Sequence, residues 1–198
     1  MKSHPILITA FFALSTAVFA APKTFTIVSN ANTKSIGTIE SKTAIETMVG
    51  KGEVTGTIQF DASKGTGGGT ISIAVKGIDT GIPLRNEHMN SANWLDSEKY
   101  PTITFKATKV QKTGADAFKV TGSFSLHGVT KTITTDVGLK LAKASDQSRK
   151  LGFKGDVVQL TSTFNIKLSD YGITIKGAAV GKISDDVTIS IAAVADSK

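Results

Sequence analysis

The sequence predicts an all-β fold of antiparallel strands around one apolar interior. From Ala21 onward, apolar and polar residues alternate along most of the chain, which is typical of strands with one buried face. Glycine-rich or polar segments of hairpin length separate the alternating stretches. Clean alternation favours antiparallel strands over a parallel sheet that helices cover on both faces. Seven or eight such strands close into a barrel or fold into a sandwich, and alternation favours neither.

The first 20 residues have the features of a secretory signal peptide. Lys2 is followed by an apolar run over residues 6–19, and Ala20 ends a small-residue cleavage site. The run is shorter than the roughly 20 residues that span a bilayer. We therefore expect cleavage after Ala20 and export to the periplasm as a secreted, mature domain of residues 21–198. Without any cysteine, that domain must be stabilised by its core.

Seven stretches show the alternation most clearly, and each places aliphatic residues or Phe on one face. Their other faces carry Thr, Ser, Lys, Gln and Asp. The residues expected to face the interior are Val54, Ile58 and Phe60 with Gly56 in phase, Ile71, Ile73, Val75, Ile103, Phe105, Ala107, Phe118, Val120, Phe124, Leu126, Ile133, Val137, Leu139, Leu141, Val158, Leu160, Phe164, Ile166, Leu168, Val187, Ile189, Ile191 and Ala193.

Helical signal is weak and confined to two places. Residues 86–95 predict one short helix that Asn86 caps, with Glu87 in its first turn. Residues 41–49 predict one turn of another. Hairpin turns are expected at residues 64–69, 113–116, 127–130 and 169–172. The basic segment 140–154 is interpreted as a solvated loop, or alternatively as a patch for peripheral contact with anionic lipid headgroups.

The longest interruption of the strand pattern, residues 77–105, concentrates polar and aromatic residues that a β-core does not require. It contains consecutive Arg85, Asn86, Glu87 and His88, and the single Trp of the chain, Trp94. We therefore expect the functional site in or facing this segment. The structural alternative is a polar plug of Arg85, Glu87 and His88 that satisfies backbone groups at one end of a barrel.

Other chemical sites find little support. The run GTGGGT at 65–70 lies between two strands and lacks the Gly-Lys-Ser/Thr ending of a phosphate loop, so it predicts a hairpin. His88 and His127, with Glu87 or Asp79, could supply metal ligands, but their spacing does not require it. No Ser or Thr lies in a recognisable nucleophile elbow. The net charge of +7 is scattered along strands with few aromatic residues, so nucleic-acid binding is not expected.

Several ordered motifs between Ile78 and Ile189 make the chain similar to a known family, the YceI-like proteins of bacterial periplasms, which are polyisoprenoid-binding and lipocalin-like. The matching residues are Ile78-Asp79-Thr80-Gly81, Arg85-Asn86-x-His88-Met89-x-Ser91, Lys99-Tyr100-Pro101-x-Ile103-x-Phe105, Gly122-x-Phe124-x-Leu126-His127-Gly128-Val129-Thr130-Lys131, Phe164-x-Ile166-x-x-Ser169-Asp170-Tyr171-Gly172 and Asp185-Asp186-Val187-Thr188-Ile189.

The resemblance implies a single antiparallel eight-stranded lipocalin-like barrel with one or two short helices. It also implies a periplasmic carrier or scavenger of a long isoprenoid or quinone-like lipid, without catalytic residues, metal or other cofactor. The polar end of the lipid is expected at Arg85, His88, Trp94 or His127. The residues expected around its tail are Phe105, Phe118, Phe124, Leu126, Leu139, Phe164 and Ile166.

The sequence departs from the family pattern in an early strand, which has Lys34-Ser35-Ile36-Gly37 in place of a His-Ser pair. It departs again at Leu168, where the family has Arg, and at Trp94-Leu95, where paired aromatic residues are common. We expect the fold to tolerate these departures. The contacts to the lipid headgroup and the length of the bound lipid should differ from those of the family. Two alternatives stay open: an interaction module at a periplasmic membrane complex, and a metal or enzyme site on His88 and His127. The tail residues could also simply fill the core.

Overall fold

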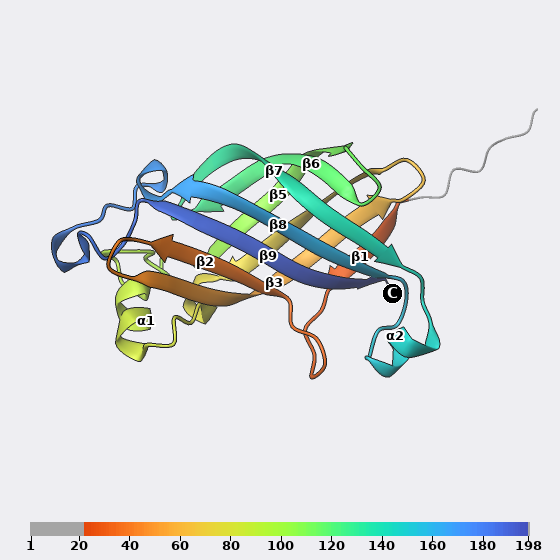
Figure 1. The fold of residues 1–198 in the computed structure, drawn as a ribbon, viewed down its shortest axis with the longest axis horizontal. Coiled ribbons are helices and arrows are strands. Elements are labelled where there is room, and N and C mark those ends of the chain that lie inside the picture. Colours follow the sequence, from red (N-terminus) through yellow and green to blue (C-terminus); the bar gives the residue numbers. More distant parts are fainter. Residues whose placement is uncertain (1–21, 198) are drawn as a thin grey trace, which may run out of the picture.

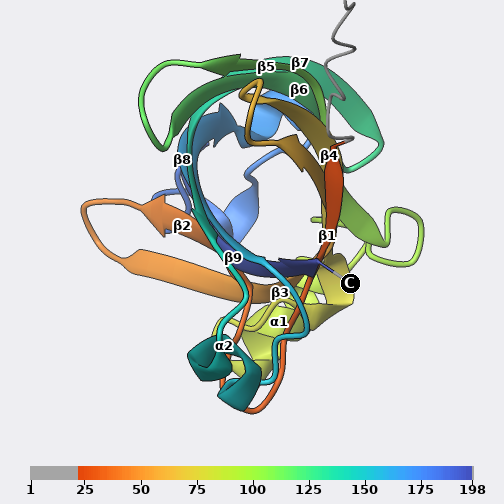
Figure 2. The ribbon, with the colours of Figure 1, turned by 90° about the vertical axis from the view of Figure 1, so that its right-hand side faces the viewer.

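The computed structural model describes residues 22–197, so the signal peptide expected at residues 1–20 lies outside the described part. Nine antiparallel strands form one sheet that closes on itself (Figures 1 and 2). The strands are β1 (Lys23–Ile27), β2 (Ile36–Lys42), β3 (Thr47–Asp61), β4 (Thr66–Ala74), β5 (Thr102–Lys112), β6 (Ala117–Leu126), β7 (Val129–Ala142), β8 (Val157–Lys167) and β9 (Asp186–Ser197).

The nine strands occupy eight positions in the barrel wall, because β1 and β2 share one. β2 pairs with the first half of β3, where Ile39 faces Gly50, and β1 pairs with the second half, where Phe25 faces Ile58. Both strands also pair with β9 on their other side. Pairing of β3 with β4 completes the ring. The expected eight-stranded antiparallel barrel is therefore confirmed.

Ser35 holds the break between β1 and β2 in place. Its side chain is fully buried. The Oγ donates a hydrogen bond to the carbonyl oxygen of Val28 (2.8 Å) and accepts one from the backbone N–H of Val194 in β9 (3.0 Å). The hydroxyl thus satisfies backbone groups that the interrupted strand leaves without ladder partners.

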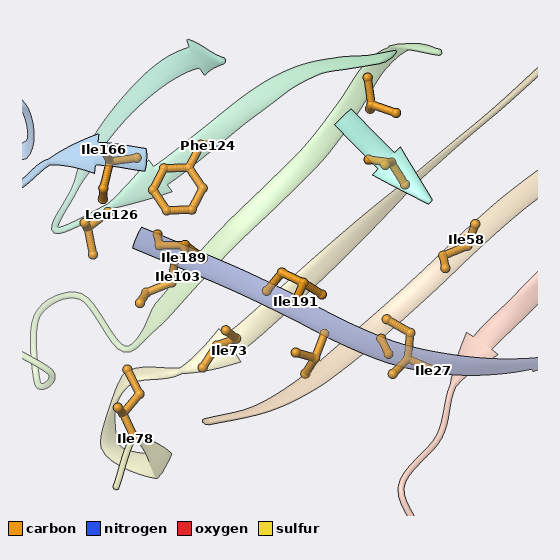
Figure 3. Close-up of a cluster of buried hydrophobic side chains, with 14 of the residues drawn as sticks. Ile27, Ile58, Ile73, Ile78, Ile103, Phe124, Leu126, Ile166, Ile189 and Ile191 are labelled. Atoms are coloured by element: carbon orange, nitrogen blue, oxygen red, sulfur yellow. The ribbon is translucent and has the colours of Figure 1, made fainter. Parts of the chain in front are cut away.

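The interior is built from the alternating apolar residues that the sequence indicated. Figure 3 shows Ile58, Ile73, Ile103 and Ile191 pointing into it from four different strands. Most inward residues are buried in the core. A minority remain partly accessible although they face inward, which indicates internal space. These are Ile71, Phe105, Ala107, Ile133, Leu141, Leu160 and Phe164.

Both helix predictions need correction. The first helix, α1, spans Pro83–Asn90 and not 86–95, because Pro83 supplies a fixed φ suited to a first helical turn. Asn86 does not cap it; its Oδ1 accepts from the backbone N–H of Thr80 (2.9 Å). Residues 41–49 form the β2–β3 hairpin, so the helical turn predicted there is wrong.

The segment predicted as a solvated loop at 140–154 is partly ordered. β7 continues to Ala142, and a short helix, α2, spans Asp146–Lys150. Ser145 and Ser148 make reciprocal side-chain and backbone contacts at its start, which is the capping-box arrangement. The described residues also form three 3₁₀ turns, at Val75–Gly77, Leu168–Tyr171 and Gly177–Ala179.

The two ends of the barrel differ. At one end, called here the α1 end, α1 lies with the β2–β3 turn and the segment 168–185 that joins β8 to β9 (Figure 1). At the other, the α2 end, lie α2, the β3–β4 turn and the end of β9. None of the helices within residues 22–197 has the length and apolarity to cross a membrane.

Candidate functional site

A cavity of about 580 Å³ opens at the α1 end of the barrel. Its walls come from β2 and the start of β3, from the segment containing α1, and from the chain between β8 and β9. Apolar side chains make up most of the lining: Ile39, Met48, Ile78, Ile82, Leu84, Met89, Trp94, Leu95, Ile103, Leu126, Ile166, Leu168, Ile173, Ile183, Val187 and Ile189.

A second, smaller cavity of about 100 Å³ lies deeper in the barrel. Small residues adjoin in this part of the wall: Ala107 of β5 pairs with Gly69 of β4 on one side and with Gly122 of β6 on the other. Its larger apolar lining residues are Ile58, Phe60, Ile71, Ile73, Phe105, Val110, Phe118, Val120, Phe124, Val137, Leu139, Leu160, Phe164 and Ile191.

Three isoleucines line both cavities, namely Ile39, Ile103 and Ile189. They come from β2, β5 and β9, and Figure 3 shows Ile103 and Ile189 together at the middle of the barrel. The two cavities therefore adjoin at these side chains. A slim apolar chain that enters at the α1 end would pass them to reach the smaller cavity.

Aromatic side chains pack against one another toward the α2 end of the interior. The rings of Phe60 and Phe118 meet edge to face with their centroids 5.6 Å apart, and Phe25 is almost completely buried. A similar cluster braces the wall nearer the α1 end, where Phe124 contacts Phe164 and Tyr171 with both centroid distances 5.5 Å. Burial raises the pKa of the Tyr171 hydroxyl above its usual value.

The charged residues that line the two cavities are at the mouth of the larger one. Arg85 forms an ion pair with Glu46 from the β2–β3 turn, and His88, Lys176 and Lys182 also line the opening. The mouth therefore carries more positive than negative groups around an apolar interior. Such an arrangement can hold an amphiphile, with its chain inside and its polar end near solvent.

A hydrogen-bonded loop positions α1 at this mouth. The backbone N–H and carbonyl of Asp79 both pair with Lys51 of β3, each at 2.8 Å. The side chain of Asp79 accepts from Asn86 Nδ2 (2.7 Å) and from the backbone N–H of Gly81 (2.8 Å). These hydrogen bonds, led by that from Asn86, lower the pKa of the Asp79 carboxyl. The polar motif of 79–86 thus anchors the loop to the barrel.

A family model described as the YceI-like domain matches residues 25–195, which is most of the chain. The chain belongs to the YceI-like family.

Curated relatives agree with this assignment over part of their length. A UPF0312 protein of Azotobacter vinelandii is 32% identical over 121 residues, which cover 60% of this YceI-like chain and 59% of the relative. The protein YceI of Escherichia coli O157:H7 is 34% identical over 99 residues, covering 49% of this chain and 51% of that one. The matched region thus spans between half and three fifths of these relatives.

Solved structures share the fold. BcnA of Burkholderia cenocepacia superposes with a TM-score of 0.67 at 22% identity, covering 81% of this chain and 95% of that one. A polyisoprenoid binding domain from Saccharophagus degradans gives a TM-score of 0.67 at 16% identity, covering 88% and 98%. The YceI protein of Campylobacter jejuni gives 0.64 at 20% identity, covering 100% and 99%.

The structure of this YceI-like protein brings together most of the residues that the sequence selected. Of the expected tail residues, Leu126 and Ile166 line the larger cavity, and five line the smaller one: Phe105, Phe118, Phe124, Leu139 and Phe164. Three of the expected polar-end residues, Arg85, His88 and Trp94, line the larger cavity. Their roles in binding stay predictions.

His127 lies apart from the other polar-end residues. Its Nδ1 donates a hydrogen bond to the carbonyl oxygen of Tyr171 (3.1 Å), and its ring packs against Tyr100 with centroids 4.7 Å apart. It occupies the β6–β7 turn, where His127 and Gly128 both have positive φ, as a type I′ turn requires. It lines neither cavity, so the structure gives it a contact within the fold.

Sequence reasoning missed the contribution of the segment between β8 and β9. This segment contributes Lys176, Lys182 and Ile183 to the lining of the larger cavity. Sequence reasoning also missed Ile39 of β2, which lines the same cavity. The segment has no alternation, and nothing in its composition indicates which part of the barrel it crosses. Within residues 22–197, no group of three or more His, Cys, Asp and Glu side chains is placed to hold a metal ion.

Proposed function

We propose that this protein binds an isoprenoid lipid in its barrel and carries it through the periplasm. The observation that carries the proposal is the pair of adjoining apolar cavities, the larger of which opens at the α1 end. The larger one, about 580 Å³, is within the roughly 300–1,000 Å³ typical of ligand pockets. The structural neighbour described as a polyisoprenoid binding domain supports the ligand class.

In the proposed complex the hydrocarbon chain enters at the α1 end and extends past Ile39, Ile103 and Ile189. Burial of the chain supplies the affinity at about 25 cal/mol per Å² of apolar surface, reduced by the cost of ordering it. The polar end, a quinone-like ring or a comparable group, stays beside Arg85 and Trp94 at the mouth. The signal-peptide features of residues 1–20 support a periplasmic site of action.

Native mass spectrometry of the exported protein, with organic extraction of bound material, tests the proposal. We expect one prenyl species per chain, either co-purified or acquired after incubation with a prenyl quinone. Binding can be followed in parallel by the emission of Trp94, the single Trp, because it lines the larger cavity. A chain that stays empty after incubation, with unchanged Trp94 emission, would refute lipid carriage.

Two variants of one segment make the test specific. Ile183→Trp enlarges a side chain that lines the larger cavity, and we expect it to lower the affinity for the lipid by at least about tenfold, through loss of roughly 1.4 kcal/mol or more of chain burial. Thr174→Trp, at an exposed position outside the lining, is the matched control and should bind normally. Equal binding by both variants would place the lipid elsewhere.

A further inference from the structure

The mouth of the larger cavity is surrounded by exposed hydrophobic side chains. Within residues 22–197, six large hydrophobic residues are exposed, and four of them lie at the α1 end: Ile45 (75% exposed), Val180 (67%), Leu84 (60%) and Ile82 (46%). Ile82 and Leu84 line the cavity itself. A Cβ placed on Gly181 would lie 3.9 Å from Cδ1 of Ile45, so the β2–β3 turn and the segment around Val180 are neighbours.

These four side chains, called here the apolar rim, belong to three separate segments. Ile45 is in the β2–β3 turn, Ile82 and Leu84 are at the start of α1, and Val180 follows the 3₁₀ turn Gly177–Ala179. Local sequence does not explain why three unrelated loops each expose an aliphatic side chain around one opening. Exposed apolar groups gathered at one place mark a surface that contacts another apolar phase or a partner.

The charges at the mouth indicate which partner fits. Arg85 is paired with Glu46, whereas no ion pair found within residues 22–197 involves Lys176 or Lys182. The acidic groups nearest in the same segment are already engaged. They are Asp185 with Ser169, Asp186 with Lys167 and Asp170 with Lys131. An apolar rim with unpaired lysines matches the surface of a bilayer that contains anionic phospholipids.

We propose that the α1 end docks on an anionic phospholipid bilayer. The apolar rim enters the headgroup region, and Lys176 and Lys182 contact lipid phosphates. The cavity mouth then faces the membrane, so an isoprenoid can move between bilayer and barrel without exposing its chain to water. The docking itself stands on the rim and the lysines, and only the transfer of lipid rests on the proposed function.

The basic segment 140–154, which the sequence offered for membrane contact, lies at the other end of the barrel (Figure 1). Two of its five basic residues are paired there. Lys143 pairs with Asp156 at 3.1 Å, and Arg149 pairs with Asp146 at 2.7 Å. Among the described residues of this segment, Leu151 alone is an exposed large hydrophobic residue, against four at the α1 end. The exposed apolar side chains therefore favour the α1 end as the docking face.

Co-sedimentation with vesicles tests this proposal. We expect binding to vesicles of phosphatidylcholine mixed with phosphatidylglycerol, weaker binding to phosphatidylcholine alone, and a decrease with added salt. The double variant Lys176→Gln, Lys182→Gln should bind the mixed vesicles about 30-fold more weakly. The double variant Ile45→Ser, Val180→Ser should lose at least about tenfold. Leu151→Ser, an exposed position beside α2 (40% exposed), is the matched control and should bind normally.

Three results would overturn the docking face: no vesicle binding by the unaltered protein, equal binding to both kinds of vesicle, or an equal loss in the Leu151→Ser control. A protein that co-purifies on the apolar rim, without vesicle binding, would replace the bilayer by a protein partner. Native mass spectrometry with prenyl quinone in solution separates the two proposals. Solution binding without vesicle binding refutes docking alone, and vesicle binding without lipid uptake refutes carriage alone.

Discussion

Replacing Ala107 by Leu should fill the smaller cavity with the protein's own side chain. Ala107 faces inward from β5 between Gly69 and Gly122, and it lines the cavity. Because Ala107 lines the cavity, the added isobutyl group would occupy part of its volume. The substitution changes the volume available to a ligand beyond Ile103 and leaves the larger cavity as it is.

The size of the effect follows from the cavity volume. Empty apolar volume costs about 24 cal/mol per Å³, so the cavity of about 100 Å³ represents about 2.4 kcal/mol. A ligand chain that fills it recovers this free energy, which corresponds to about 50-fold in affinity at 1.4 kcal/mol per tenfold. In Ala107→Leu the protein recovers part of it instead, so the free energy of unfolding without ligand should rise by about 1 kcal/mol.

The assay compares two prenyl quinones, one long enough to pass the three isoleucines and one too short, by titration of Trp94 emission. Ala107→Leu should weaken binding of the long quinone by about 50-fold and leave that of the short one unchanged. Chemical denaturation should show the gain in stability. The same substitution at Ala142, exposed near the end of β7, is the control. A stabilised variant that binds the long quinone as tightly as before would refute passage into the smaller cavity.

Three further substitutions test the fold. Ser35→Ala leaves the Val194 N–H unpaired and should cost about 2 kcal/mol, a fall of about 4–8 °C in Tm by calorimetry. Gly128→Ala, at φ +76° and with its Cβ 2.4 Å from a Tyr100 ring carbon, should cost about 2 kcal/mol by denaturant titration. Hydrogen bonds led by that from Lys23 lower the pKa of the Asp156 carboxyl in the folded protein. The ionised carboxylate therefore contributes its full stabilisation above the unfolded-state pKa of 3.8, and this stabilisation is lost as the pH falls below 3.8. Asp156→Asn should make Tm less dependent on pH in this acid range.

The strands could be predicted wherever large apolar residues carry the inward face. β1 and β2 lacked that signal, because β1 has five residues and the inward positions across β2 and the start of β3 include Gly37, Gly50 and Gly52. A Cβ at Gly37 would lie 2.4 Å from Cδ1 of Ile73, so a side chain from another strand fills that space. A pattern of alternating apolar residues does not reveal an inward-facing glycine whose space is filled by a side chain from another strand.

The sequence predicted the apolar character of the candidate site better than it predicted where the cavities lie. Alternation indicated that residues such as Phe105 and Phe164 face an apolar interior, but it did not separate a filled core from a cavity. That difference depends on how small residues such as Ala107 adjoin across strands, which is set by register. The lysines at the mouth belong to a connection without alternation, so their position depends on where the chain crosses the barrel end.

The shared position of β1 and β2 has a consequence for how the chain folds. Phe25, in the first strand, pairs with Ser197, at the end of the last one, so this part of the barrel wall forms only when both strands are present. Contacts between such distant residues slow folding, typically to milliseconds or seconds. Refolding kinetics of a variant truncated before β9 would show whether any stable intermediate forms without that last strand.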